Sequence, residues 1–184
     1  MARENMDERW GFETRAIHAG QKPDPQTGAI TVPVYQTTTY EQDEVGKDRG
    51  YEYSRTGNPT RDALEISVAA LEGAEFGRAF ASGMAAEDTI LRLLSPGDHI
   101  VMGNDAYGGT FRLISKVLTR MGVTWSAADF SKRENIENCL TDRTRVVWAE
   151  TPSNPLLSVV DIQMLSEVAH SIGAWCVVDN TFAT

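Results

Sequence analysis

The chain has few basic residues, and it lacks any long apolar run. Its 17 Lys and Arg residues are outnumbered by 26 Asp and Glu residues, which gives a net charge of −9, and no dense basic run occurs. This balance argues against nucleic acid or an anionic membrane as a partner. No apolar stretch of signal or membrane-spanning length follows the charged N-terminal residues, so we expect a cytoplasmic protein whose partners are small molecules.

Cysteine and nucleotide-binding signatures are also scarce. The two cysteines, Cys139 and Cys176, have no Cys or His at metal-ligand spacing, so we expect inert thiols and no metal site. No Gly-x-Gly-x-x-Gly occurs, and a dinucleotide fold therefore lacks its fingerprint. Residues 103–110 imitate a phosphate-binding Walker A loop, but Gly109 stands where that motif needs Lys. A nucleotidase is thereby disfavoured, although it stays as an alternative.

Strand-like and helix-like segments alternate along most of the chain. Asn58-Pro59 has the residue types that begin a helix, and Gly73 those that end one. Strands are then expected at 78–81, 99–102, 123–126, 145–149 and 174–179, and helices at 84–94, 109–121, 131–140 and 161–172. This order predicts an α/β fold, with a mostly parallel sheet and helices on both faces. The run that ends at Asp179 is short, apolar and β-branched, which predicts a buried strand.

The first 50 residues differ from the rest of the chain. They contain three of the seven prolines and no sustained helical period, which predicts an extended arm over residues 1–50 before a main domain over 51–184. Such an arm is either disordered or packed on another surface. Apolar residues such as Trp10, Phe12 and Val34 favour packing on a neighbouring subunit.

Polar residues follow several of the expected strands. Asp179 ends the last strand, where ligands of open α/β sheets lie, although it also suits a simple turn cap. Ser82-Gly83 joins a strand to a helix, whose free N–H groups can bind a phosphate; a plain helix cap is the alternative. Tyr107, between strand and helix, has an aromatic ring that can stack on a flat ligand. Asn154 lies in a loop with two prolines that would fix its amide.

Tyr53 and Arg55 precede the helix at Asn58-Pro59. They are two residues apart in an extended segment, so both side chains can point the same way. The guanidinium of Arg suits bidentate binding of phosphate, although an Arg near a helix start is often only solvated.

Four motifs in combination resemble the pyridoxal-phosphate (PLP) enzymes of cysteine and methionine metabolism, the transsulfuration family of cystathionine γ-synthase and γ-lyase. They are Tyr-Ser-Arg-Thr-Gly-Asn-Pro-Thr, Ser-Gly-Met-Ala-Ala, Glu-Thr-Pro-Ser-Asn-Pro and Val-Asp-Asn-Thr-Phe. The resemblance runs from Thr14 to Phe182. It implies the large domain of fold-type I PLP enzymes, which is like that of aspartate aminotransferase, in truncated form.

The resemblance also implies roles for the polar residues. The N–H groups of Gly83 and Met84 would hold the PLP phosphate, Tyr107 would stack on the ring and assist proton transfer, and Asp179 would bind the protonated ring nitrogen. The other residues implied to contact the cofactor are Tyr53 and Arg55, from a neighbouring subunit, and Ser82, Asn154 and Thr181. Tyr107 and Asp179 would be the catalytic pair, and sites shared between subunits imply a homotetramer.

One feature of the family is missing. Its Schiff-base lysine lies in a Ser-x-Thr-Lys motif beyond the position of Asp179, and Lys22, Lys47, Lys116 and Lys132 have no such context. We therefore expect part of a longer enzyme that acts on amino-acid substrates. The Tyr107-to-Thr110 segment is more similar to the γ-synthase and γ-lyase branches than to methionine γ-lyase, where Cys commonly replaces Gly109. We favour the synthase over the lyases; a non-catalytic binding module is the alternative of another class.

Overall fold

The computed structural model describes residues 9–183, and the chain divides into two compact units. The first extends to Ala81 and the second begins at Ser82. No helix in the described part of the chain combines the length and apolarity that crossing a membrane requires. The predicted division into an arm over 1–50 and a domain over 51–184 stays a prediction.

The first unit contains two helices, α1 (Phe12–His18) and α2 (Pro59–Leu71), which contact each other. Helix α2 begins as the sequence predicts, because the Asn58 side chain accepts a hydrogen bond from the Thr60 N–H at 2.9 Å and Pro59 follows it. Gly20 has a φ of +75°, and a Cβ there would lie 2.4 Å from the Ala63 carbonyl oxygen. Only glycine therefore fits where the chain passes α2.

Helix α1 corrects the prediction of an arm without helix. Its seven residues make only two turns, so the sequence shows no sustained period. The helix is held at its start by Arg15, which donates to the Trp10 carbonyl at 3.0 Å. From residue 19 to 57 the described chain has no strand beyond isolated bridges such as Thr39 with Tyr53. Whether this part forms an extended arm on a neighbouring subunit stays a prediction.

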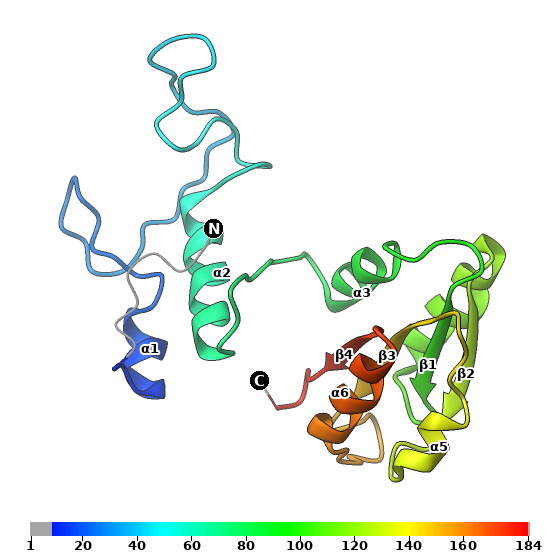
Figure 1. Ribbon diagram of the computed structural model, residues 1–184. Helices are drawn as coiled ribbons and strands as arrows, with labels where there is room; N and C mark the ends of the chain where they lie inside the picture. Colours follow the sequence, from blue (N-terminus) through cyan, green and yellow to red (C-terminus); the bar gives the residue numbers. More distant parts are fainter. Residues whose placement is uncertain (1–8, 184) are drawn as a thin grey trace. The chain divides into compact units, whose positions relative to one another are not determined.

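The second unit is built on a four-stranded parallel sheet in the order β2-β1-β3-β4 (Figure 1). Its strands are β1 (His99–Gly103), β2 (Thr124–Ala128), β3 (Thr144–Glu150) and β4 (Trp175–Asp179). All three neighbouring pairs are parallel, as the alternation of elements predicts. The strand predicted at 78–81 is wrong: these residues are extended but have no partner strand among the described residues.

Helices cover both faces of this sheet, which confirms the predicted α/β architecture. They are α3 (Gly83–Leu91), α4 (Gly108–Arg112), α5 (Arg133–Glu137) and α6 (Ile162–Ser171). Helix α4 continues without a break into the π-helical turn η1 (Leu113–Val117) and the 3₁₀ turn η2 (Leu118–Met121). The helix predicted over 109–121 is thus one helical run whose hydrogen-bonding pattern changes along its length.

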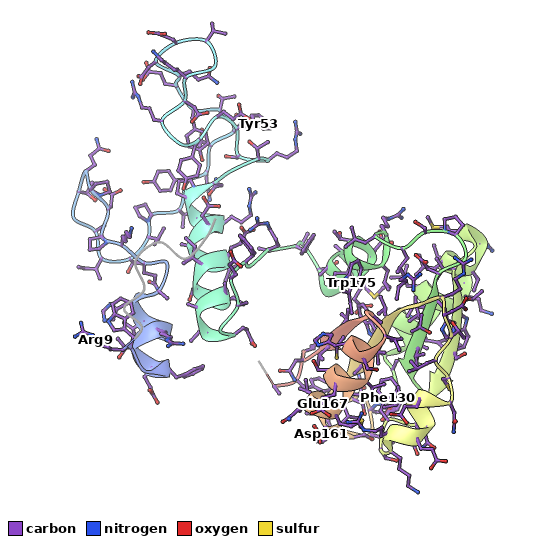
Figure 2. The ribbon with its side chains drawn as sticks, in the orientation of Figure 1. Arg9, Tyr53, Phe130, Asp161, Glu167 and Trp175 are labelled. Carbon is purple, nitrogen blue, oxygen red and sulfur yellow. The ribbon has the colours of Figure 1, made fainter. Side chains whose placement is uncertain are left out.

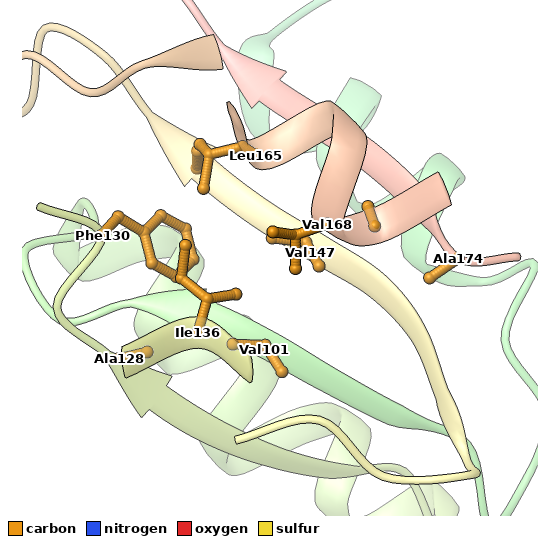
Figure 3. Close-up of a cluster of buried hydrophobic side chains, with 10 residues drawn as sticks. Val101, Ala128, Phe130, Ile136, Val147, Leu165, Val168 and Ala174 are labelled. Atoms are coloured by element: carbon orange, nitrogen blue, oxygen red, sulfur yellow. The ribbon is translucent and has the colours of Figure 1, made fainter. Parts of the chain in front are cut away.

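Alternate residues of the strands pack into two separate hydrophobic cores, one on each face of the sheet. Val101 and Val147 pack with Leu165 and Val168 of α6 on one face (Figure 3). Their strand neighbours Ile100, Met102, Val146 and Trp148 pack on the other face with Leu91, Leu113, Ile114, Leu118 and Val123. Because successive side chains of a strand point to opposite faces, an unbroken apolar run is what a doubly covered strand needs.

Strand β4 is parallel, as predicted, but it is not buried. Among the described residues it pairs only with β3, so it forms an edge of the sheet. Trp175, at its start (Figure 2), is 47% exposed. Its remaining residues are half-buried. An apolar, β-branched run predicts burial on both faces, and an edge position removes part of that cover.

Candidate active site

The carboxyl ends of the four parallel strands carry acidic or polar residues along one edge of the sheet. Asp129 directly follows β2, Glu150 ends β3, and Asp179 ends β4. A cavity of about 150 Å³ at this edge is lined by residues that include Asp105, Asp129 and Glu150. Ligands of open parallel sheets bind at such an edge, because the loops that follow the strands meet there.

Glu150 connects two of the loops with its carboxylate. Its Oε2 accepts a hydrogen bond from the Tyr107 backbone N–H at 2.5 Å, and its Oε1 accepts one from the Asn154 backbone N–H at 2.9 Å. In the sheet Glu150 lies in register with Asp179 on β4. The structure therefore brings Tyr107, Asn154 and Asp179, which the sequence places far apart, to one edge of the sheet.

The loop after β3 is anchored by further hydrogen bonds. Ser153, which is 2% exposed, donates through its hydroxyl to Asp105 at 2.5 Å and accepts from the Ser158 N–H at 3.0 Å. The Thr151 N–H donates to the Asp179 carbonyl at 2.9 Å. The loops after β1, β3 and β4 are thus held by one network, although the Asn154 side chain itself is exposed.

Among the described residues, the Asp179 carboxylate has donors only from its own turn. Thr181 donates to Oδ1 through its N–H at 3.1 Å and through its hydroxyl at 2.5 Å. Within residues 9–183, no ion pair joins Asp179 to a cationic side chain. This carboxylate is therefore available to a cation from outside the chain, and its predicted role in binding one stays a prediction.

Two further carboxylates, those of Glu87 and Glu150, lie near Asp179. Burial is the largest cause of a raised pKa for both Glu87 and Glu150, and the charge of Asp179 raises each pKa further. Glu87 is 8% exposed and accepts a hydrogen bond from the Thr110 hydroxyl at 2.7 Å.

Tyr107 precedes α4, and its ring lies over Gly109. A Cβ at Gly109 would be 2.3 Å from Tyr107 Cε1 and 2.8 Å from Met84 Sδ, so any larger residue would displace one of these side chains. Because Met84 belongs to the first turn of α3, the start of that helix lies next to the tyrosine. The tyrosine is 42% exposed, which leaves ring surface for a ligand.

The start of α3 offers free hydrogen-bond donors. Ser82 caps the helix by accepting from the Ala85 N–H at 3.2 Å, which was the alternative to a phosphate site. No described residue accepts a hydrogen bond from the N–H groups of Gly83 or Met84. A Cβ at Gly83 would meet nothing within 4 Å, so the space beside these donors is open. This arrangement can bind an anion such as a phosphate.

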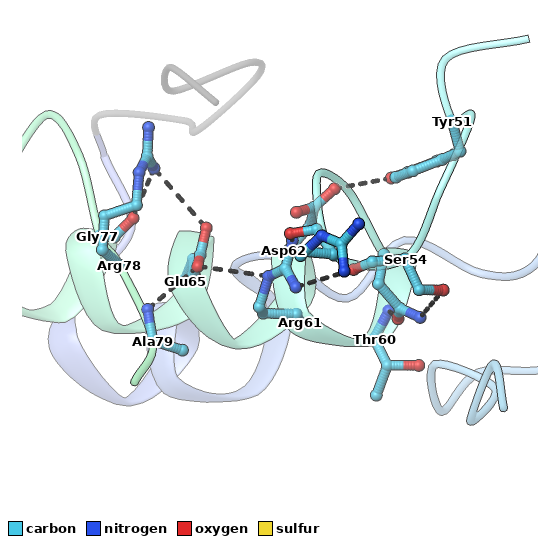
Figure 4. Close-up of polar contacts among 11 residues, drawn as sticks. Tyr51, Ser54, Thr60, Arg61, Asp62, Glu65, Gly77, Arg78 and Ala79 are labelled. Carbon is cyan, nitrogen blue, oxygen red and sulfur yellow. Dashed lines mark hydrogen bonds and ion pairs between the residues drawn. The ribbon is translucent and has the colours of Figure 1, made fainter. Parts of the chain in front are cut away.

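Tyr53 and Arg55 lie in the first unit, and they do pair. The Arg55 guanidinium lies over the Tyr53 ring, 4.7 Å from its centroid. The same segment is held by Arg61, which donates to the Ser54 carbonyl at 2.9 Å and pairs with Glu65 at 3.7 Å (Figure 4). Their predicted role at the phosphate of a neighbouring subunit stays a prediction.

Comparison with known proteins identifies the family. The family model described as Cys/Met metabolism PLP-dependent enzyme matches residues 13–184. The chain belongs to this family. Curated relatives include cystathionine gamma-synthase from Mycobacterium tuberculosis, 54% identical over 176 residues, and cystathionine beta-lyase from Lactococcus lactis, 50% identical over 173 residues. These matches cover 95% and 94% of this chain.

Two solved structures share the fold of this chain as well as its sequence. The crystal structure of metB from Corynebacterium glutamicum has a TM-score of 0.93 at 50% identity and is matched over 96% of this chain. Cystathionine gamma-lyase from Lactobacillus plantarum, complexed with L-serine, gives 0.90 at 47% identity over 95% of this chain. The chain spans 45% of the M. tuberculosis relative and 46% of each solved chain, so it corresponds to less than half of these proteins.

The residues of the second unit fit the PLP that the family uses. The free N–H groups at the start of α3 can donate to a phosphate, and the Tyr107 ring can stack on a flat ring. The Asp179 carboxylate can accept from a ring N–H⁺. Each of these three features carries the charge or shape that its part of the cofactor requires. Individual contacts to the cofactor remain proposals.

Sequence reasoning assigned no role to several polar residues at this edge: Glu87, Asp105, Thr110, Glu150 and Ser153. Glu150 stood within the Glu-Thr-Pro-Ser-Asn-Pro motif, directly after a buried strand, which was a usable signal. Glu87 gave no such signal, because Asp88 and Thr89 follow it in the helix and its burial cannot be read from the sequence.

Proposed function

We propose that this chain is part of a PLP-dependent transsulfuration enzyme of the cystathionine γ-synthase type. The reaction would replace the γ-acyloxy group of O-acyl-L-homoserine with the thiol of L-cysteine. The observation that carries the proposal is the unpaired Asp179 carboxylate at the sheet edge that also holds Tyr107 and the start of α3. Identity of 54% to cystathionine gamma-synthase from M. tuberculosis supports the choice of reaction.

The proposed roles of the residues follow from their chemistry. The N–H groups of Gly83 and Met84, with Ser82, hold the phosphate at the positive end of α3. Tyr107 covers the ring and moves a proton through its phenol, while the amide of Asn154 lies near the ring hydroxyl. Asp179, oriented by Thr181, keeps the ring nitrogen protonated. When bound, the pyridinium ring accepts electron density from the substrate carbon.

The packing at Gly109 favours the synthase and the cystathionine γ-lyase over methionine γ-lyase. The Tyr107 ring and Met84 leave no room for a Cβ at this position. A cysteine there, as commonly found in the methionine γ-lyase branch, would require both side chains to move. Elimination remains the second candidate, because relatives at 47–50% identity are named cystathionine beta-lyase and gamma-lyase.

Steady-state assays of the complete enzyme distinguish these reactions. We expect turnover of O-acyl-L-homoserine plus L-cysteine to cystathionine. In parallel assays, cystathionine alone and methionine alone should be much poorer substrates. Turnover of cystathionine without any γ-replacement would reject the synthase in favour of a lyase, and no turnover of any of them would favour a non-catalytic module.

We propose further that the complete enzyme is a homotetramer, a dimer of dimers in which Tyr53 and Arg55 bind the phosphate of a neighbouring subunit. The exposed apolar residues of the first unit, such as Ile30 and Val34, support packing on another subunit. Mixing an inactive Arg55→Ala protein with an inactive Asp179→Ala protein should restore activity, because hybrid dimers contain one intact site. No recovery in mixtures shown to exchange subunits would mean that each site lies within one subunit.

A further inference from the structure

We propose that Glu150 is a positioning residue whose carboxylate fixes the Tyr107 ring and the Asn154 loop for the cofactor. This inference rests on the proposed function, because the proposed cofactor is the ligand that both loops would contact. Glu150 is not itself required to touch substrate or cofactor. It acts through the backbone of Tyr107 and Asn154, the two residues that are proposed to contact the cofactor.

The geometry uses both oxygens of the side chain. Oε2 accepts the Tyr107 N–H at 2.5 Å, and Oε1 accepts the Asn154 N–H at 2.9 Å. The two donors lie 47 positions apart in the sequence and belong to loops after different strands. One rigid strand end therefore determines where the backbone of both loops lies. Hydrogen bonds to an ionised group are stronger than those between neutral groups. Two of them on one carboxylate fix both the distance and the orientation of the two donors.

Only a carboxylate satisfies both amides. The corresponding Gln has one acceptor oxygen and one NH2 group, so one backbone N–H would face another donor. Burial raises the pKa of Glu150, and the hydrogen bonds from Tyr107 and Asn154 lower it again. The amides thus stabilise the ionised form against burial and against the charges of Asp179 and Asp105, the carboxylates that raise its pKa.

Glu87 provides a matched control for the same chemical change. It is a buried carboxylate, whereas Glu150 is half-buried, and the charge of Asp179 raises the pKa of both. Its hydrogen-bond partner, however, is the Thr110 hydroxyl. A hydroxyl can donate to the amide oxygen of Gln as well as to a carboxylate. Glu87→Gln should therefore keep its contact, whereas Glu150→Gln should lose one.

Hydrogen–deuterium exchange of the complete protein without cofactor tests the position of the loops. We expect Glu150→Gln to accelerate exchange at least tenfold in peptides that contain residues 104–110 and 152–158, with no change in β1 and β3. Glu87→Gln should leave both loops as protected as in the unaltered protein. Glu150→Asp, which keeps the charge but is one methylene too short to reach both amides, should release at least one loop.

Binding of pyridoxamine 5′-phosphate is the second readout, because this probe needs no covalent bond to the protein. We expect Glu150→Gln to bind it at least tenfold more weakly, and Glu87→Gln to bind it within about twofold of the unaltered protein. Unchanged exchange in both loops of the Glu150 variants would overturn the inference, as would exchange that rises equally throughout the sheet. If the unaltered protein binds no pyridoxamine 5′-phosphate, the proposed function fails, while the exchange result still decides whether Glu150 holds the loops.

Discussion

Asp179→Asn should lower kcat/KM of the complete enzyme by a factor of about 10² to 10³, the effect typical of losing one preorganised electrostatic contact. Asparagine keeps the shape of the side chain and can still accept from the Thr181 N–H, which lies 3.1 Å from Oδ1. It carries no charge, so the ring nitrogen would lose its proton and the ring would accept electron density poorly. Steady-state kinetics with the preferred substrate pair measure this loss.

Asp129→Asn is the matched control for that substitution. Asp129 also follows a strand of the same sheet and accepts a hydrogen bond from the N–H two residues on, Ser131, at 2.9 Å. Asp129 also lines the cavity at this sheet edge, but no contact to the cofactor is proposed for it. The kcat/KM of the Asp129→Asn enzyme should therefore stay within about twofold of the unaltered enzyme. Equal effects at both positions would mean that Asp179 is no more than a turn cap as well.

Gly109→Ala should destabilise the protein and impair cofactor binding together. The added Cβ would lie 2.3 Å from the Tyr107 ring and 2.8 Å from Met84 Sδ, so both side chains must move. Overpacking of this kind costs about 1 to 3 kcal/mol, which is more than alanine gains over glycine in a helix. Thermal unfolding and titration with pyridoxamine 5′-phosphate measure the two effects.

The neighbouring Gly108→Ala provides the comparison. A Cβ at Gly108 would meet only the end of the flexible Arg112 side chain, at 3.2 Å. The higher helix propensity of alanine should therefore leave stability unchanged or raise it slightly. If Gly109→Ala behaved like Gly108→Ala, the Tyr107 ring would not lie over Gly109 in solution, and the proposed stacking position would be wrong.

The parts of the fold that depend on local pattern could be predicted from the sequence. Asn58 begins its helix as expected, because its side chain accepts from a backbone N–H of the first turn. Ser82 and Asp161 do the same at the starts of the helices expected over 84–94 and 161–172. The parallel order followed from the alternation of strands and helices. The sequence could not show that residues 78–81 lack a partner strand or that β4 is only half-buried. Both features depend on which neighbouring strands are present.

The candidate site was predictable to a similar extent. Asp179, Tyr107 and Ser82 follow or precede elements that the sequence makes clear, and parallel strands place their ends at one edge. Glu150 was missed because its function depends on backbone donors of two distant loops, which carry no residue-type signal. The crowding at Gly109 was also missed, because the sequence does not show which rotamer Tyr107 adopts.

The protonation of a bound ring nitrogen tests the central claim most directly. Pyridoxamine 5′-phosphate labelled with ¹⁵N in its ring can be bound to the complete protein and its ¹⁵N chemical shift followed as the pH is raised. The account predicts a pyridinium shift that persists above the pKa of the free ring, and its loss in Asp179→Asn but not in Asp129→Asn. A bound ring that is neutral at pH 8 in the unaltered protein, or that titrates identically in both variants, would contradict it.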